Sequence, residues 1–343
     1  MLSSAQLERP SLGFVGHQGR VCPHCIGTLE TATGSYFCVR CETNFPSLDG
    51  IADLRIASDR YLDLASERTK ARRLASIAAT TNLTGLSSAY YAMTDDVDDR
   101  RRKRFLAHIR AAEERGEILA DTLRASDRVL EIGCGTGGLL LAALRRGIDI
   151  EGVDIASRWL VLARKRLQEG AGVAHVGSRN SNEVLTAANA EALPWPDESF
   201  DCVVADSVIE HLANPCAVFA EWLRVVKPGG RLILWSPNRF SLATDPHVGL
   251  WAVGWLPRQF QASLVRARRR CPWPIQLRTA IESARLARHA GWTVRRAEPS
   301  PAPSRSVACH HLYERARKLP LARNLLLRFG PLWQIIAERE VTA

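Results

Sequence analysis

From residue 127 onward, short apolar runs alternate with longer segments whose apolar positions recur every three or four residues. This alternation predicts a mostly parallel sheet whose strands are joined by crossover helices. Strands are expected at residues 128–132, 150–153, 184–188, 202–205 and 232–235, with helices at 157–168 and 216–226 between them.

The alternation stops over residues 237–278 and then resumes. A helix at 279–290 ends before Gly291, a residue that readily adopts the left-handed conformation of a helix end. Strands at 292–297 and 333–338 follow, and the amphipathic stretch 311–328 between them is interrupted by Pro320. Before the sheet, we expect helices at 61–79 and 98–123 and a turn at 82–88.

Two C-x2-C pairs lie near the N-terminus, with twelve residues between them. Each pair places two thiolates on one tight turn, and two pairs complete a tetrahedral zinc site with no open position. Residues 19–54 are too few to bury a core, so metal ligation supplies folding energy. We therefore predict a structural zinc ribbon, with His24 as a bystander. The ligands are Cys22, Cys25, Cys38 and Cys41.

The other five cysteines are scattered singly along the chain. This distribution is typical of a reducing compartment and disfavours the alternative that the two pairs form disulfides.

A glycine-rich turn follows the strand at 128–132. Gly133, Gly135 and Gly138 also fit the dinucleotide fingerprint G-x-G-x-x-G, so the turn alone does not identify its nucleoside. Glu131, inside the preceding strand, favours a cationic amino-acid group over a pyrophosphate. Asp154 ends the second strand, where a carboxylate accepts hydrogen bonds from ribose hydroxyls in both kinds of fold.

Three downstream motifs decide between these possibilities. They are Asn-Ala-Glu-Ala-Leu-Pro at 189–194, Pro-Asp-Glu-Ser-Phe-Asp at 196–201 and Lys-Pro-Gly-Gly at 227–230. With the glycine turn, they make residues 127–236 resemble class I S-adenosylmethionine-dependent methyltransferases, in particular the group that includes ubiquinone and menaquinone methyltransferases.

The resemblance implies a doubly wound α/β fold with a mostly parallel seven-stranded sheet. It divides the chain into a zinc ribbon (1–56), a helical linker that caps the cofactor (57–124) and a methyltransferase core (125–343). The insert at 237–278 would cover the substrate.

The resemblance also implies the cofactor contacts. Glu131 and the loop 133–137 would hold the methionine end of S-adenosylmethionine, Asp154 the ribose, and residues 189–191 the adenine edge. The family often has aspartate where this chain has Asn189, which keeps a hydrogen-bonding side chain and removes a charge. The expected cofactor-binding residues are Glu131, Gly133, Cys134, Gly135, Thr136, Gly137, Asp154, Ile155, Asn189, Ala190, Glu191 and Asp206.

Methyl transfer requires alignment, exclusion of water and, for an O or N–H acceptor, a base. His211 follows the fourth strand, and ligands of open α/β sheets bind beyond the carboxyl ends of strands. It either accepts a proton or only shapes the pocket. His247 in the insert is the second candidate base, with a structural hydrogen bond as its alternative role.

Some quinone methyltransferases resemble metal binders with a Glu-x-x-Glu-His pattern. Ser207 breaks that pattern here, so we expect no catalytic metal.

Two groups of aromatic residues have candidate roles near the site. Trp251 and Trp255 either line an aromatic or lipidic substrate pocket or pack the insert on the core. The stretch 249–256 and the arginines after it could instead contact a membrane surface. Tyr90 and Tyr91 could close over the cofactor, as an N-terminal helix does in relatives.

The formal net charge is +10, and its distribution is uneven. Residues 257–343 hold 17 Lys or Arg and 5 Asp or Glu, so the basic excess lies in the C-terminal quarter. This excess fits an anionic partner or a solvated arginine-rich surface. No apolar run is long enough for a transmembrane helix, and the first residues lack a secretory pattern, so we expect a cytoplasmic protein.

We therefore expect an enzyme that methylates a small-molecule acceptor: a secondary metabolite, quinone, lipid or sugar. The alternative is an RNA methyltransferase, because the ribbon-then-core order resembles zinc-bearing ribosomal RNA guanine methyltransferases and the basic region suits phosphates. Those relatives typically have histidine in place of Cys41 and lack the Glu-His motif, which is Glu210-His211 in this chain. The ribbon also resembles methyltransferase activator subunits, which indicates a partner-binding or scaffold role. Neither the accepting atom nor the oligomeric state follows from the sequence.

Overall fold

A computed structural model describes residues 19–32, 34–94, 99–170, 183–302 and 310–341. Its centre is a sheet of seven strands: β5 (Arg128–Ile132), β6 (Asp149–Asp154), β7 (Leu185–Ala187), β8 (Phe200–Asp206), β9 (Val226–Pro237), β10 (Thr293–Pro299) and β11 (Leu332–Glu338). Their order is β7-β6-β5-β8-β9-β11-β10, and the pairs from β7 to β9 are parallel while β11 pairs antiparallel with both neighbours. The predicted doubly wound, mostly parallel seven-stranded sheet is confirmed.

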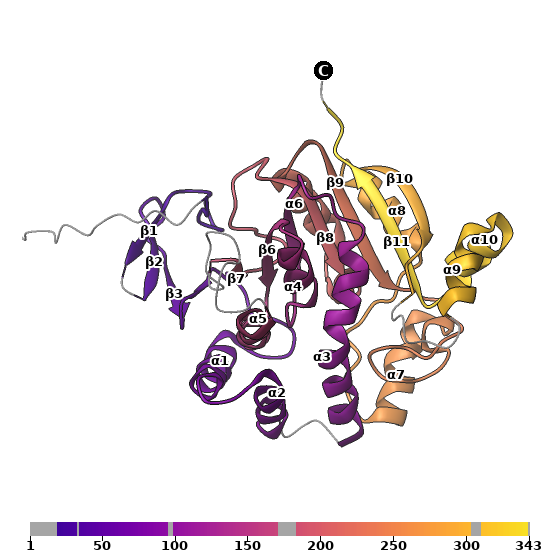
Figure 1. Cartoon of the computed structure of the whole chain (residues 1–343), viewed down its shortest axis with the longest axis horizontal. Helices are drawn as coiled ribbons and strands as arrows, with labels where there is room; N and C mark the ends of the chain where they lie inside the picture. The colour runs from indigo at the N-terminus through magenta and orange to yellow at the C-terminus, as the bar shows by residue number, and fades with distance from the viewer. Residues whose placement is uncertain (1–18, 33, 95–98, 171–182, 303–309, 342–343) are drawn as a thin grey trace, which may run out of the picture.

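Helices cover both faces of the sheet (Figure 1). They are α1 (Leu64–Ala78), α2 (Leu83–Ala92), α3 (Asp99–Ala120), α4 (Gly138–Arg145), α5 (Ser157–Gly170), α6 (Pro215–Val225), α7 (Arg258–Arg269), α8 (Ala280–His289), α9 (His310–Lys318) and α10 (Pro320–Phe329), with short 3₁₀ turns η1 (Ile209–His211) and η2 (Val253–Trp255). One buried cluster joins α6 and α8 to the sheet, and a second joins α4 and α5 to its other face. None of the described helices combines the length and apolar character needed to cross a bilayer.

The helix α3 approaches α4 closely where each contributes a glycine. A Cβ placed on Gly116 would lie 2.2 Å from the carbonyl oxygen of Gly138, well inside van der Waals contact. The absence of side chains at these positions lets α3 lie directly against the helix that follows the glycine loop. This contact fixes the N-terminal half of α3 beside the carboxyl ends of the strands, as Figure 1 shows.

The turn expected at 82–88 is wrong, because α2 begins at Leu83. The Asn82 side chain accepts a hydrogen bond from the backbone N–H of Gly85, so the residues that suggested a turn form a helix cap. Tyr90 and Tyr91 are buried between α2 and its neighbours, and the Tyr90 hydroxyl contacts Arg158 of α5 at 3.3 Å. Both tyrosines therefore pack the helical region onto the core.

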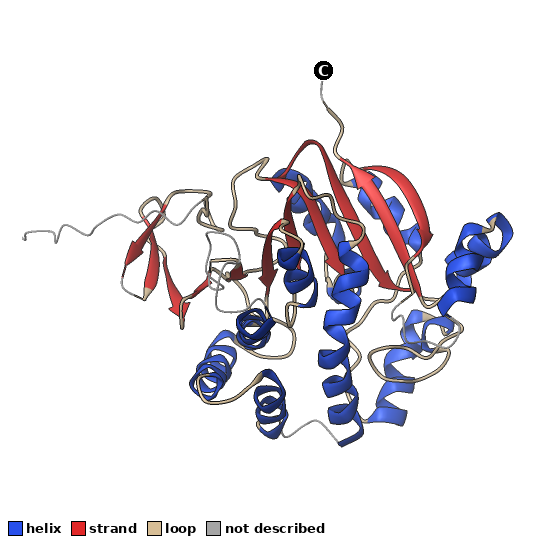
Figure 2. Cartoon of the chain, viewed as in Figure 1, coloured by secondary structure: helices blue, strands red, loops and turns tan. Residues whose placement is uncertain are grey.

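The N-terminal region is continuous with the central sheet (Figure 2). It contains β1 (Leu29–Ala32), β2 (Ser35–Cys38), β3 (Asn44–Leu48) and β4 (Ile51–Asp53). The first three strand pairings are antiparallel, whereas β4 pairs in parallel with β7 and extends the sheet to 11 strands. The expected boundary at residue 56 thus follows directly after a strand that the ribbon and the core share.

Candidate active site

The glycine loop between β5 and α4 has a tightly turned backbone. Gly133, Gly135 and Gly137 have φ values of 70°, 50° and 75°, which favour glycine over other residues. A Cβ on Gly133 would lie 2.4 Å from Val208 Cγ2, so the loop also lacks room for a side chain. The backbone N–H groups of Gly133 and Cys134 donate to the carbonyl oxygen of Val153 at 2.8 and 3.1 Å. These contacts hold the loop against the end of β6.

Three carboxylates converge at this loop. Burial raises the pKa of Glu131 well above its usual range, and the nearby carboxylates of Asp206 and Asp154 raise it further. Glu131 Oε2 is buried and has no hydrogen-bond partner among the described residues. An unsatisfied carboxylate oxygen beside two further acids is costly unless a cation binds there. The site therefore fits a positively charged ligand group, such as the ammonium and sulfonium of S-adenosylmethionine.

Asp154 at the end of β6 is oriented by the backbone. Its two carboxylate oxygens accept hydrogen bonds from the N–H groups of Gly135 and Ala156, each at 2.8 Å. Burial raises the pKa of Asp154, and these two hydrogen bonds oppose that rise. The carbonyl oxygen of Ile155 accepts a hydrogen bond from Arg55 at 3.0 Å, so the end of β6 is also tied to the ribbon segment.

The other loop residues have side chains turned toward the protein. The Cys134 sulfur lies 2.9 Å from where a Cβ on Gly152 would be, and burial raises its pKa well above the usual range. The Thr136 carbonyl oxygen accepts a hydrogen bond from Arg166 at 2.7 Å. The Thr136 hydroxyl also lies 3.4 Å from Arg166, so the side chains of Cys134 and Thr136 are both engaged within the protein.

The three residues expected at the adenine edge differ in their surroundings. Asn189 is buried, and its side-chain oxygen accepts hydrogen bonds from the backbone N–H groups of Ile56 and Ala57 at 2.9 and 3.2 Å. The carbonyl oxygen of Ala190 accepts a hydrogen bond from Trp222 at 3.2 Å, and Glu191 is exposed. The side chain of Asn189 thus ties the chain after the ribbon to the core.

The carboxyl end of β8 carries a salt bridge and a strained residue. Arg115 of α3 donates to both oxygens of Asp206, at 3.0 and 3.3 Å. Ser207 has a φ of 59°, uncommon for a residue with a side chain, and its N–H donates to the carbonyl oxygen of Trp235. Strain of this kind concentrates at functional sites, where the surrounding structure holds it in place.

The two candidate histidines lie together, with ring centroids 5.2 Å apart. His247 lies between two carboxylates: its Nε2 is 3.6 Å from Glu210 and its Nδ1 is 3.6 Å from Asp245. Burial alone would lower the pKa of His247, but these carboxylates outweigh it and raise the pKa to about 9. Burial lowers the pKa of His211, and the neighbouring His247 adds to that effect while Glu210 opposes it. At neutral pH, His247 is therefore the cation of the pair and His211 the neutral imidazole.

Glu210 of the Glu-His motif belongs to this site, together with Tyr61 and His108, which the sequence did not single out. Glu210 is fully buried and accepts a hydrogen bond from Ser236 at 3.1 Å. Tyr61 places its hydroxyl 3.5 Å from Nδ1 of His211. Partial desolvation lowers the pKa of His108 on α3, an effect that Asp206 opposes and His247 reinforces.

One ligand atom from each of Glu210, His211 and His247 lies within 4.8 Å of the others, an arrangement that could hold a metal ion. A protonated His247 already supplies positive charge beside Glu210. The expectation that no catalytic metal is used stays a prediction.

The four predicted zinc ligands come together in the ribbon. The ligand atoms of Cys22, Cys25, Cys38 and Cys41 lie within 4.8 Å of one another. Cys22 Sγ is 3.5 Å from Cys41 Sγ, and Cys25 Sγ is 3.5 Å from Cys38 Sγ. Thiolates around a tetrahedral zinc ion lie about 3.8 Å apart, so the arrangement fits zinc. None of the eight cysteines in the described part of the chain forms a disulfide.

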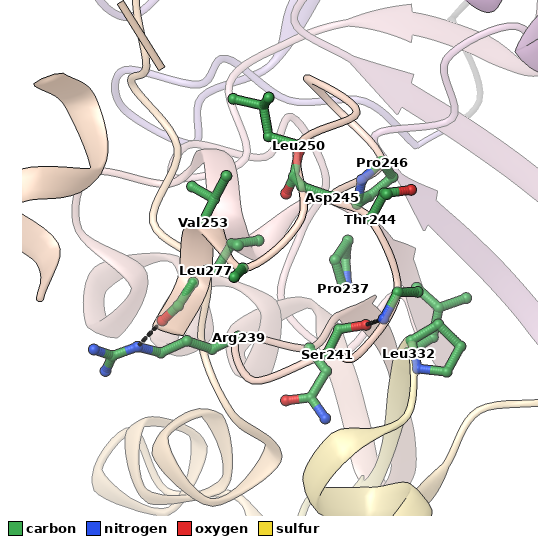
Figure 3. A pocket seen from close by; sticks show the side chains of 15 residues that line it. Pro237, Arg239, Ser241, Thr244, Asp245, Pro246, Leu250, Val253, Leu277 and Leu332 are labelled. Atoms are coloured by element: carbon green, nitrogen blue, oxygen red, sulfur yellow. Dashed lines mark hydrogen bonds between the residues drawn. The ribbon is translucent and has the colours of Figure 1, made fainter. Parts of the chain in front are cut away.

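The insert forms an apolar cavity of about 170 Å³. Figure 3 shows Leu250, Val253 and Leu277 around it, with Pro237 and Leu332 from the ends of the sheet strands. Asp245, the partner of His247, also lines the cavity. The cavity therefore lies next to the histidine pair.

Trp251 and Trp255 of the insert lie outside this cavity lining. Trp251 is 63% exposed, and the indole of Trp255 stacks on Phe329 of α10 with ring centroids 5.9 Å apart. Their indole N–H groups donate to the carbonyl oxygens of Leu242 and Ser241. The ring contact supports a packing role for Trp255, whereas Trp251 stays largely exposed.

Comparison with known proteins gives a family match. Residues 130–234 match the family described as "Methyltransferase domain". A ubiquinone biosynthesis O-methyltransferase from Paracidovorax citrulli (strain AAC00-1) is 37% identical over 166 residues, which are 46% of this chain and 63% of that protein. A demethylmenaquinone methyltransferase from Tropheryma whipplei (strain Twist) is 33% identical over 119 residues, which are 34% of this chain and 45% of that protein.

The chain spans less than two thirds of the length of these curated relatives. Among solved structures, a SAM-dependent methyltransferase from Thermotoga maritima, described as a possible histamine N-methyltransferase, is similar over 71% of this chain and 96% of that chain. The two share 22% identity with a TM-score of 0.43. The names of the curated relatives do not favour the RNA alternative.

Proposed function

We propose that this chain, whose residues 130–234 form a class I S-adenosylmethionine-dependent methyltransferase domain, methylates a small-molecule acceptor. The observation that carries the proposal is the meeting of Glu131, Asp154 and Asp206 at the glycine loop, where Glu131 Oε2 has no partner among the described residues. A dinucleotide pyrophosphate would be repelled by these carboxylates, whereas a cationic amino-acid nucleoside would be attracted.

Different residues of the pocket would bind different parts of S-adenosylmethionine. Glu131 would accept hydrogen bonds from the ammonium, the backbone of residues 133–137 would hold the methionine part, and Asp154 would accept from the ribose hydroxyls. Asp206, held by Arg115, adds negative charge near the sulfonium. Residues 189–191 border the adenine, with Asn189 acting mainly through its hold on residues 56 and 57.

S-adenosylmethionine, when bound, supplies a methyl group activated by its sulfonium. His211 is the residue that receives the acceptor's proton, because its lowered pKa keeps it neutral at neutral pH. Its Nδ1 lies 3.5 Å from the Tyr61 hydroxyl. In the tautomer whose Nδ1–H donates to Tyr61, Nε2 is the atom that accepts the acceptor's proton. His247 stays protonated between Glu210 and Asp245 and positions the insert beside the acceptor.

The acceptor would lie in the apolar cavity of the insert. Leu250, Val253, Leu277 and Leu332 exclude water from it, which suits a molecule with an apolar body. Two of the curated relatives are named for steps of ubiquinone and menaquinone synthesis, and a quinone-like acceptor is the class these names support.

We also propose that the four cysteines of the ribbon bind a structural zinc ion. Four protein ligands leave no open coordination position, so the ion stabilises the ribbon and takes no part in catalysis. The isolated free thiols of the described residues support a reducing compartment, and we place the protein in the cytoplasm.

The proposal is tested by calorimetric titration of the full chain with S-adenosylhomocysteine and, separately, with NADH. Micromolar binding of S-adenosylhomocysteine alone is expected. Binding of NADH alone, or of neither ligand, would contradict the assigned pocket and leave the scaffold role. The protein that binds S-adenosylhomocysteine is then screened for methyl transfer to quinols and other hydroxylated acceptors.

A further inference from the structure

The two helices between β10 and β11 have exposed leucines on their outer side. Along α10, Leu321 and Leu325 lie one turn apart and are 76% and 53% exposed. Leu312 of α9 and Leu319 lie seven residues apart and are also exposed. Spacings of four and seven residues place side chains on one side of a helix. A surface helix of a globular protein usually turns polar residues outward, whereas these helices turn leucines outward.

A different side of α10 attaches it to the core. Leu327 packs against the buried cluster that joins α6 and α8 to the sheet, and its carbonyl oxygen accepts a hydrogen bond from Asn238 at 3.0 Å. The exposed leucines take no part in this packing. Apolar side chains that gather on an exposed surface usually mark a site of interaction.

Basic side chains accompany these leucines. Arg315 and Arg328 each follow one of the leucines by three residues, so each arginine shares the outer side of its helix. Both are exposed, and neither forms an ion pair with an acidic side chain of the described residues. Glu314 of α9 is already paired with Arg317. We call this outer side the α9–α10 face; it comprises Leu312, Arg315, Leu319, Leu321, Leu325 and Arg328.

The insert continues the face with further exposed apolar residues. Phe329 lies one turn after Leu325, and Trp255 stacks on its ring. The carbonyl oxygen of Phe329 accepts a hydrogen bond from the N–H of Leu242 at 3.0 Å, and Leu242 is 60% exposed. The carbonyl oxygen of Leu242 in turn accepts from the indole of Trp251. Tryptophan is enriched where proteins meet the interface of a membrane.

The apolar cavity of the insert lies beside this surface. Ser241, which precedes Leu242, lines the cavity, and so does Pro331, which follows the end of α10. Figure 1 shows α9 and α10 standing out from the sheet on the side of the insert. A molecule with an apolar body partitions into the hydrocarbon of a bilayer, so a bilayer on this surface would hold such molecules next to the cavity.

We propose that the α9–α10 face and the adjoining insert residues dock on the surface of an anionic lipid bilayer. The leucines and tryptophans lie at the boundary between headgroups and acyl chains, and Arg315 and Arg328 reach the lipid phosphates. A nucleic acid would contact the arginines and leave the leucines in water, and two copies of this face would bring like charges together.

The docking surface belongs to parts of the chain outside residues 130–234, which match the methyltransferase family. Docking therefore does not depend on the proposed function. The uptake of an apolar acceptor from the bilayer into the insert cavity does rest on that function.

The test measures co-sedimentation of the full chain with phosphatidylcholine vesicles, prepared with and without phosphatidylglycerol. The variant Leu321→Ser/Leu325→Ser removes apolar contacts, and Arg315→Gln/Arg328→Gln removes two charges. All four side chains are exposed, so the Tm of each variant should match that of the unaltered chain.

Two matched controls replace similar side chains elsewhere. Val39→Ser/Val341→Ser exchanges two exposed aliphatic residues, one in the ribbon and one beyond the end of β11 that lies away from α10. Arg72→Gln/Arg73→Gln exchanges two exposed arginines of α1. The ribbon strands lie at the opposite end of the sheet from β10 and β11.

The unaltered chain and both controls should bind the phosphatidylglycerol vesicles equally, and bind phosphatidylcholine alone more weakly. Each variant of the face should lower the partition coefficient by at least about tenfold, because it removes two apolar side chains or two charges from the membrane surface. Absence of vesicle binding overturns the proposal. Binding that either face variant leaves unchanged, or that the controls weaken equally, overturns it as well.

Two further measurements identify another occupant if the vesicles do not bind. Loss of single-stranded RNA binding in the arginine variant alone would assign the face to a nucleic acid. Loss of a concentration-dependent dimer in the leucine variant, measured by sedimentation velocity, would make it an interface between copies. S-adenosylhomocysteine is titrated in parallel, and its failure to bind would overturn the proposed function while leaving the vesicle result unaffected.

Discussion

The substitution Glu131→Gln tests the cationic pocket most directly, because it removes one charge and keeps the side-chain shape. A hydrogen bond to a charged group contributes about 1.5–3 kcal/mol, which corresponds to a loss of about 10- to 150-fold in affinity for S-adenosylhomocysteine. A unit charge pair at 4 Å is worth about 4 kcal/mol at an effective dielectric constant of 20, so this range lies below the electrostatic limit.

The pH dependence gives the same test a second readout. Burial and the carboxylates of Asp206 and Asp154 hold the pKa of Glu131 well above its usual range. The ligand-free folded protein therefore binds more protons at Glu131 than the unfolded chain does. The contribution of Glu131 to the free energy of unfolding is consequently lost as the pH rises. A cationic ligand binds the ionised form, so affinity should increase with pH, by at most about tenfold per unit for one released proton.

The assay is calorimetric titration with S-adenosylhomocysteine between pH 6 and 8, in two buffers of different ionisation enthalpy. The unaltered protein should release protons on binding, and Glu131→Gln should release up to one fewer. The pKa of Asp154 is also raised, so the variant keeps any slope that Asp154 supplies. Glu298→Gln, on the distant edge strand β10, serves as the control. Equal affinity and equal proton release in the unaltered protein and Glu131→Gln would refute the reasoning.

Three further predictions concern the ribbon, the helix contact and the histidine pair. Cys38→Ser should lose zinc, measured by elemental analysis, and lower Tm, whereas Cys216→Ser should keep both; unchanged zinc content would remove the ribbon assignment. Gly116→Ala should cost about 1–3 kcal/mol in denaturant unfolding, because the new Cβ would lie 2.2 Å from a carbonyl oxygen of α4, and an unchanged midpoint would contradict this packing. His247, with its pKa raised to about 9, contributes stability below pH 6.5 that is lost as the pH rises to about 9. This stabilisation amounts to at most about 3 kcal/mol and should be absent in His247→Gln. Tm is measured against pH for both proteins, and parallel curves would contradict the prediction.

The strands of the core could be predicted because each is a local apolar run. The structure places β5, β6, β8 and β9 over the expected residues, and the motifs at their ends lie at one edge of the sheet. The glycine loop, Asp154 and Asp206 therefore meet as a parallel sheet requires. The helix α2 was missed because Asn82 and Gly85 are common in turns, and here the asparagine caps a helix.

The contribution of α3 to the site was also missed, although the sequence contains a signal for it. Arg104, His108 and Arg115 are spaced by four and seven residues, which places them on one face of a helix. That polar stripe faces the site, with Arg115 on Asp206 and Arg104 on the insert. The stripe precedes the family motifs, and the close packing of Gly116 on α4 holds α3 near the site.

The pairing of β4 with β7 has no local signal at all. Parallel neighbours in a sheet are set by the tertiary arrangement, and β4 is only three residues long. The spacing of the cysteines predicted the zinc ligands, but nothing in the sequence predicted that the strands of the ribbon extend the central sheet.

The pairing of β4 with β7 affects how the protein would aggregate if the ribbon unfolded. Without β4, the backbone of β7 would be an open edge, and the exposed N–H and C=O groups of such an edge can recruit strands from other chains. The ribbon therefore protects the nucleoside-binding side of the sheet from aggregation. Loss of metal should first appear as self-association through β7, while any molecules that stay monomeric keep the chemistry of the distant histidine pair.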